Sequence, residues 1–232
     1  MSNCEVKLVA VTKPVIDGIE SAEDFVAYAA RVSNPANQNN TETSGRLLKY
    51  LLKNKHWSPF EMVHVCVEIN TTRDIARQIL RHRSFAFQEF SQRYANATDL
   101  GFVTREARLQ DSKNRQASVD TTDSTLIFEW GELQYHLTEQ VKKIYKWALD
   151  NGIAKEQARA VLPEGLTKSR LYMSGTLRSW IHFCQVRCDI STQKEHREVA
   201  NKVLEILSKE FPSISELVND IQQVGVQPVS GS

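Results

Sequence analysis

The segment MVHVCVEIN, residues 62–70, constrains the fold more than any other stretch of this chain. Its apolar side chains alternate with less apolar ones, at Val63, Val65, Val67 and Ile69. A period of two is typical of a β-strand with one buried face. Thr71 and Asp74 follow at the spacing of a capping pair, which indicates a helix running to about residue 81. The segment therefore predicts a strand that leads directly into a helix.

Similar patterns predict the other elements of the chain. Strands are expected over residues 5–12, 101–105 and 169–174, and helices over residues 21–32, 42–54, 125–150, 154–162, 176–184 and 192–210. The polar segment 106–124 lacks periodicity and is expected to be a surface loop or insertion. Because no repeat and no linker rich in Pro, Gly or Ser divides the chain, we predict one domain over residues 1–232. The expected fold class is α+β, with a mostly antiparallel central sheet flanked by helices.

The long helix predicted over residues 125–150, in the second half of the chain, carries an apolar stripe. Its members recur near helical spacing: Leu126, Trp130, Leu133, Leu137, Val141, Ile144 and Trp147. Such a stripe is more typical of a core or of a contact between subunits than of a cofactor site.

Composition excludes several classes of protein. The chain has 232 residues, 25% of them charged, and a net charge of +1, which argues against a dedicated nucleic-acid-binding protein. No run approaches the ~18 apolar residues of a membrane span, so no membrane partner is expected. Four scattered cysteines fit a reducing compartment, and we expect a cytoplasmic protein. His182, Cys184 and Cys188 lack a second ligand pair, so no metal site is predicted.

Cationic side chains concentrate around the segment RHRSFAFQEFSQRY, residues 81–94. Between residues 73 and 93, five arginines against Asp74 and Glu89 leave a local charge of +3 in a chain of +1. Arginine makes paired hydrogen bonds to phosphate, and Ser91 adds a hydroxyl group nearby. The cluster favours an anionic ligand, although a solvated surface stripe or a non-catalytic nucleotide- or RNA-binding module would have the same residues.

The spacing of this cluster resembles the signature of the flavin-dependent thymidylate synthases, which is R-H-R, seven residues, then S-x-R. Further blocks of that family are matched in order by AARVSNP (residues 29–35), HWSPFE (56–61), ARAVLP (158–163) and LRSWIHFCQVRCD (177–189). The chain departs from the usual family pattern at Thr176, His182, Gly165 and Ser191.

The resemblance implies a site for FAD and a site for dUMP. The residues expected to bind FAD are Ser33, Ser58, Glu61, Arg81, His82, Arg83, Glu89, Thr176, Arg178 and His182. Those expected to bind dUMP are Gln78, Arg81, Glu89, Ser91, Gln92, Arg93, Arg159 and Arg187. Arg187 is the expected catalytic residue, because an arginine near N3 and O2 of uracil would stabilise negative charge on the ring.

The resemblance also implies a reaction and an assembly. It predicts reductive methylation of dUMP to dTMP, with 5,10-methylenetetrahydrofolate as the carbon donor and FAD reduced by NADPH as the electron source. The family's sites are shared between the subunits of a homotetramer. Since none of the four cysteines has a recognisable activating base, covalent attack by a thiolate is not expected, and Ser91 is expected to bind rather than attack.

Overall fold

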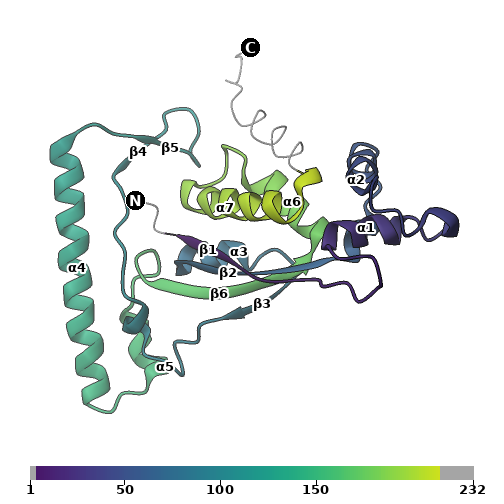
Figure 1. Ribbon diagram of the computed structural model, residues 1–232. Helices are drawn as coiled ribbons and strands as arrows, with labels where there is room; N and C mark the ends of the chain where they lie inside the picture. The colour runs from purple at the N-terminus through teal and green to yellow at the C-terminus, as the bar shows by residue number, and fades with distance from the viewer. Residues whose placement is uncertain (1–3, 215–232) are drawn as a thin grey trace.

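The computed structural model describes residues 4–214 and has a four-stranded antiparallel sheet at its centre (Figure 1). The spatial order is β1-β2-β6-β3, with bounds Glu5–Val11 (β1), His64–Thr72 (β2), Lys168–Thr176 (β6) and Phe85–Glu89 (β3). All three strand pairs are antiparallel. The predicted α+β class with a mostly antiparallel sheet is therefore confirmed.

The alternation in β2 gives the sheet a buried face and an open face. Val65, Val67 and Ile69 are fully buried, whereas the side chains between them lie on the opposite face. Helices α3 (Arg73–Ile79), α6 (Leu177–Arg187) and α7 (Lys194–Glu210) supply core residues on the buried face. The indole N–H of Trp180 on α6 donates to the Val65 carbonyl at 2.9 Å, which fixes α6 against the middle of the sheet.

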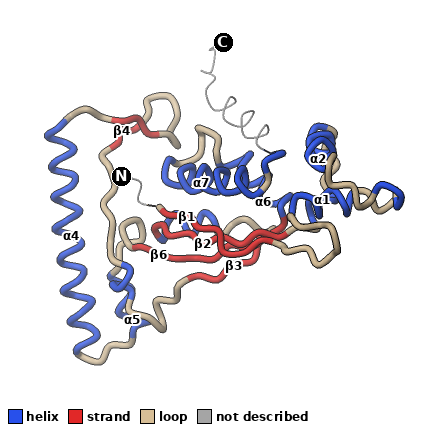
Figure 2. The backbone as a smooth tube through the Cα atoms, in the orientation of Figure 1, coloured by secondary structure: helices blue, strands red, loops and turns tan. Residues whose placement is uncertain are grey.

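Two further helices, α1 (Ala22–Ala30) and α2 (Ser44–Lys53), lie together at one end of the molecule (Figure 2). The Ser21 hydroxyl accepts from the Asp24 N–H at 3.0 Å, so the predicted cap of the first helix is confirmed. The expected capping pair of α3 is wrong by one residue, because Thr72, the last residue of β2, is the N-cap in place of Thr71.

Strand β3 was not expected from the sequence, because the segment after Arg83 reads as a ligand-binding loop. Its alternate residues Phe85 and Phe87 pack against the core, with the Phe85 ring 4.6 Å from that of Trp180. The strand predicted over residues 101–105 is wrong, since only Phe102 forms an isolated bridge, to Thr167. The N–H group of Val103 instead donates to the carbonyl oxygen of Leu166, which lies in a loop.

The second half of the chain begins with a hairpin and a long helix. The segment 106–124 contains two short paired strands, β4 (Arg108–Gln110) and β5 (Ser118–Asp120), that the sequence did not indicate. Helix α4 (Ser124–Asp150) then extends alongside the body of the molecule (Figure 1). Within its apolar stripe only Val141 is buried, and Leu133 is 65% exposed.

A short helix and five single-turn 3₁₀ helices complete the described chain. In place of one helix over residues 154–162, α5 (Lys155–Ala158) gives way to the 3₁₀ turn η4 (Arg159–Val161). Pro163 follows closely, and a residue preceding proline is biased away from helical geometry. The other 3₁₀ turns are η1 (Pro35–Asn37), η2 (Ser58–Glu61), η3 (Ala97–Leu100) and η5 (Pro212–Ile214). None of the helices in residues 4–214 combines the length and apolar character needed to cross a membrane.

Candidate active site

A cavity of about 510 Å³ lies where β6 leads into α6. Four residues predicted to bind the flavin line it: Glu61, Thr176, Arg178 and His182. The remaining lining residues, which the sequence did not single out, are Trp57, Ser84, Ser179 and Gln185. Residues more than 100 positions apart in the chain are thus brought together at one end of the sheet.

The amino end of α6 supplies the polar wall of this cavity. The Thr176 hydroxyl accepts from the Ser179 N–H at 3.2 Å and so caps the helix. Arg178 donates from Nη1 to Glu61 Oε1 at 2.6 Å, and this hydrogen bond is the main reason why the pKa of Glu61 is lowered. The wall therefore combines a cation, a carboxylate and helix N–H groups.

The other predicted flavin residues differ in how they relate to the cavity. Ser58 begins η2 directly after Trp57, and Arg83 directly precedes Ser84, so both adjoin lining residues. Ser33 is exposed in the turn that follows α1 and is not among the residues that line the cavity.

Arg187, the expected catalytic residue, contacts His82, which is predicted to bind the flavin. Arg187 donates from Nε to His82 Nε2 at 2.9 Å, which requires an unprotonated His82 Nε2. Burial, then the positive charge of Arg187, lower the pKa of His82 to about 4, so the ring is neutral near pH 7. The ring also packs edge-on against Phe183 at 5.0 Å. The expected catalytic arginine is thus held in a defined orientation.

Gln78 is held from two sides by residues at the start of α7 that the sequence gave no reason to choose. It donates from Nε2 to Gln193 Oε1 at 2.7 Å, and its Oε1 lies 3.3 Å from His196 Nδ1. Burial and the charge of Arg187 lower the pKa of His196 to about 3, so this ring is neutral too. Only tertiary packing brings residues 115 or more positions apart into contact, which is why no local pattern indicates them.

The remaining predicted substrate residues lie near the far end of β3. Glu89 accepts from Ser169 Oγ at 2.6 Å and pairs with Arg73 at 3.3 Å. Arg93 lies 3.5 Å from Glu156, whose carbonyl oxygen also accepts from Arg159 Nε at 3.3 Å. Arg93 and Arg159 are therefore neighbours around one residue of α5.

Two more predicted residues lie in the turn after β3. The Ser91 hydroxyl accepts from the Arg93 N–H at 3.4 Å. Gln92 is buried, and its Nε2 has no hydrogen-bond partner within residues 4–214. A buried amide without a partner is costly, so a ligand or a neighbouring chain that accepts from it would stabilise this turn.

Strand β3 separates the two groups of residues. It is preceded by Arg81, His82 and Arg83 and ends at Glu89, and five strand residues span about 13 Å. After the ligands predicted for their residues, we call the cavity at one end the flavin half-site, and the group around Ser91, Arg93 and Arg159 the phosphate half-site. Among the described residues, no group of three or more His, Cys, Asp or Glu side chains is arranged to hold a metal ion.

Comparison with known proteins identifies the family of the chain. Residues 14–213 match the family model described as "Thymidylate synthase complementing protein". The chain is 50% identical over 213 residues to the "Probable flavin-dependent thymidylate synthase" of Paramecium bursaria Chlorella virus 1, covering 92% of this chain and 98% of that protein. The chain belongs to the flavin-dependent thymidylate synthase family.

Other members and one solved structure extend the comparison. The flavin-dependent thymidylate synthase of Synechocystis is 49% identical over 214 residues, covering 91% of this chain and 97% of that protein. The crystal structure of a UMP/dUMP methylase from Streptomyces cacaoi, bound with 5-Br dUMP, has a TM-score of 0.80 at 27% identity and covers 95% of this chain and 96% of its own. These relatives are enzymes, so the interpretation as a non-catalytic binding module finds no support.

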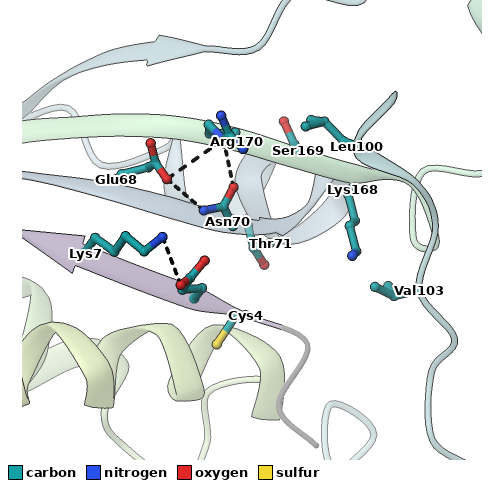
Figure 3. Close-up of a pocket in the computed structure, with 11 residues that line it drawn as sticks. Cys4, Lys7, Glu68, Asn70, Thr71, Leu100, Val103, Lys168, Ser169 and Arg170 are labelled. Carbon is teal, nitrogen blue, oxygen red and sulfur yellow. Dashed lines mark hydrogen bonds and ion pairs between the residues drawn. The ribbon is translucent and has the colours of Figure 1, made fainter. Parts of the chain in front are cut away.

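A second cavity of this thymidylate synthase family member, of about 360 Å³, lies at the open face near the start of β1 (Figure 3). Two of its cations already have partners: Lys7 pairs with Glu5 at 3.0 Å, and Arg170 donates to Asn70 at 3.0 Å. Asn70 in turn donates to Glu68 at 2.9 Å. None of the predicted site residues lines this cavity, and we assign no chemistry to it.

Proposed function

We propose that this protein makes dTMP from dUMP, with 5,10-methylenetetrahydrofolate as the carbon donor and NADPH as the reductant of a bound FAD. The observation that carries the proposal is the convergence of Glu61, Thr176, Arg178 and His182 on one cavity, together with the contact between Arg187 and His82. Membership of the family and the dUMP methylase neighbour agree with it.

The residues of the flavin half-site fit FAD chemically. Arg178, at the amino end of α6, offers positive charge and guanidinium N–H groups to phosphate oxygens. Trp57 offers an aromatic surface, and Glu61 offers acceptors. His182 and Thr176, where the chain departs from the usual family pattern, still present polar side chains to the same cavity. FAD would supply the two electrons that turn a methylene group into a methyl group.

Arg187 would stabilise the negative charge that develops on the uracil ring. Because its Nε donates to His82, its two Nη groups are directed elsewhere and are available to ring oxygens and nitrogens. A neutral His82 can accept this hydrogen bond and a protonated one cannot, which links the orientation of Arg187 to the buried state of His82.

The nucleotide phosphate would bind at the phosphate half-site. Arg93 and Arg159 supply charge, Ser91 supplies a hydroxyl group, and the buried amide of Gln92 supplies an N–H donor, whereas Arg81 precedes β3 at the opposite end of the strand. Glu89 would accept from the sugar or the base, since its carboxylate is already oriented by Ser169.

The cysteines do not support a covalent mechanism. Burial raises the pKa of Cys66 and, strongly, that of Cys184. Cys188 has a lowered pKa because Cys184 hydrogen-bonds to it, but it is buried. We therefore propose that carbon transfer proceeds without a protein thiolate.

The exposed apolar stripe of α4 supports the proposal of a homotetramer with sites shared between subunits. Exposed large apolar patches mark interaction surfaces, and Leu133 and Trp147 are 65% and 61% exposed. Leu133→Glu should dissociate the assembly, as measured by light scattering, while Lys143→Glu on an exposed polar position should leave it intact. A wild-type monomer, or a Leu133→Glu protein with unchanged mass, would contradict this proposal.

We further propose that residues 1–232 act as one domain in the cytoplasm and that nucleic acid is not a partner. A gel-shift experiment at low salt tests the last point, since a nucleic-acid-binding protein would show salt-sensitive binding.

The absorption spectrum of the purified protein with added FAD tests the function. We expect a flavin band that is bleached anaerobically by NADPH and restored by oxygen. Addition of dUMP and 5,10-methylenetetrahydrofolate to the reduced protein should then yield dTMP. Failure to bind added FAD, or bleaching without any dTMP, would contradict the proposal.

A further inference from the structure

A directed chain of hydrogen bonds runs from Glu195 to Gln78. Gln193 donates from Nε2 to Glu195 Oε2 at 2.9 Å, and its Oε1 accepts from Gln78 Nε2 at 2.7 Å. Gln78 Oε1 then lies 3.3 Å from His196 Nδ1. An ionised carboxylate only accepts, so Glu195 determines which end of the Gln193 amide faces it, and Gln193 in turn determines the orientation of the Gln78 amide.

Glu195 is kept ionised by its surroundings. Burial would raise its pKa, but the backbone N–H groups, Gln193 and two arginines outweigh burial, so the pKa is lowered. Arg105 lies 3.2 Å from Glu195 Oε1, and Arg108 pairs with the same oxygen. These arginine and glutamate side chains are all largely buried, which limits screening of their charges by water.

His196 completes the chain at the other end. The ring is 1% exposed, and its Nε2 has no hydrogen-bond partner within residues 4–214. The contact with Gln78 Oε1 therefore fixes the tautomer, with the proton on Nδ1 donating to Gln78. The Gln78 amide has one further N–H donor and one further lone pair available to a ligand. Rotating the amide by 180° to exchange them would break its hydrogen bonds to Gln193 and His196.

A side-chain amide of fixed sense can distinguish uracil from cytosine. Uracil has a carbonyl acceptor at position 4 and a donor at N3, whereas cytosine has an amino donor at position 4 and an acceptor at N3. An amide free to rotate by 180° can pair with either base, but a fixed one pairs with one and leaves unmatched groups against the other.

We propose that Gln193 and Glu195 are positioning residues that make Gln78 selective for a uracil nucleotide over a cytosine nucleotide. The proposal rests on the proposed function, because it takes Gln78 to face the base of dUMP. Arg187 adjoins the same group through its charge on His196 and its contact with His82, which places Gln78 and Arg187, both predicted to bind dUMP, in one cluster.

Two substitutions of Gln193 test the proposal without disturbing the core, since Gln193 is exposed. Gln193→Met has similar volume and cannot orient Gln78. Gln193→Ala removes the same partner of Gln78 with a smaller side chain and should act in the same direction. Lys194→Met, which removes an ion pair with Glu106 outside the chain of hydrogen bonds, is the matched control.

The measurement is the ratio of the Kd for dCMP to that for dUMP, obtained by calorimetry on the FAD-loaded protein. We expect Gln193→Met to lower the ratio about tenfold, because dCMP no longer meets a mismatched amide. Gln193→Ala should lower it similarly, and Lys194→Met should stay within about twofold of wild type. If Gln193 had only a structural role, its substitution would weaken the binding of both nucleotides equally and leave the ratio of the two Kd values unchanged.

Two results would overturn the proposal, and they differ in what else they contradict. If wild type binds dUMP selectively and Gln193→Met has the same ratio, the proposed role of Gln193 and Glu195 is wrong but the proposed function is unaffected. Failure of wild-type protein to bind dUMP would contradict the proposed function as well.

Discussion

The two half-sites lie at opposite ends of the same short strand but are built differently. The flavin half-site is a hollow formed where residues 57–61, the start of β3 and the amino end of α6 converge. The phosphate half-site is a set of polar side chains around the turn after β3 and the start of η4, with Arg93 59% exposed at its side chain. Convergence of distant segments creates a volume, whereas a turn and a short helix alone create a surface.

The difference also appears in the charges. Arg178 already has a carboxylate at 2.6 Å within its half-site, while Arg93 makes a looser contact of 3.5 Å with Glu156. Ion pairs between exposed side chains contribute little, so an incoming phosphate can displace Glu156 from Arg93 at small cost. The phosphate half-site therefore has the features of a surface that a ligand or another subunit completes.

The largest effect is expected for Arg187, the predicted catalytic residue. Arg187→Ala should retain FAD but lower turnover about 10²–10³-fold, because the developing charge on uracil loses its stabilising group. Steady-state rates and the flavin spectrum measure the two properties. Arg170→Ala, which removes an arginine on the open face of the sheet, is the control and should have near wild-type turnover. Wild-type turnover in Arg187→Ala would show that this residue is not catalytic.

The next largest effect should show that FAD and dUMP bind at different half-sites. Arg178→Ala should weaken FAD binding about tenfold or more, since charged hydrogen bonds contribute about 1.5–3 kcal/mol. Binding of dUMP to protein saturated with FAD should change little. Arg178→Lys keeps the charge and should give an intermediate affinity. Equal losses for FAD and dUMP would indicate that the two half-sites are one.

The pH dependence of the free energy of unfolding tests whether His82 is buried in its neutral form. The pKa of His82 is lowered to about 4 in the folded state, from 6.5. Between these values the unfolded chain binds more protons, so the free energy of unfolding falls as pH drops from about 6.5 towards 4. His82→Gln should flatten that fall, as measured by urea denaturation at several pH values. His136→Gln, on the exposed face of α4, should not. A slope equal to that of wild type in His82→Gln would contradict the buried neutral state.

The smallest effect on turnover is expected for Ser91 in the phosphate half-site. Ser91→Ala should keep measurable turnover and raise the KM for dUMP a few-fold, because one neutral hydrogen bond contributes about 0.5–1.5 kcal/mol. Initial rates over a range of dUMP concentrations give both parameters. Complete loss of turnover with dUMP affinity intact would assign Ser91 a chemical role.

Local sequence patterns predicted the elements that are stabilised mainly by interactions between residues close in sequence or by one buried face. The alternation of β2 and the cap at Ser21 were sufficient, because they report a buried face and a satisfied N–H group directly. Strand β3 escaped prediction since its charged flanks resemble a binding loop, and only pairing with β6 makes it a strand. The apolar stripe of α4 was predicted correctly as a helix, but a periodic pattern does not reveal what covers it.

The sequence by itself determined the fold class, the arginine-rich signature and, through the spacing of that signature, the family. Only the tertiary structure decided that Glu61 and Arg178 face one cavity, that His82 orients Arg187, and that Gln193 and Glu195 orient Gln78. The physical reason is that, apart from the local bond between Gln193 and Glu195, these contacts join side chains from separate elements more than 100 positions apart. Their geometry depends on how the sheet and helices pack, which no local spacing of residues encodes.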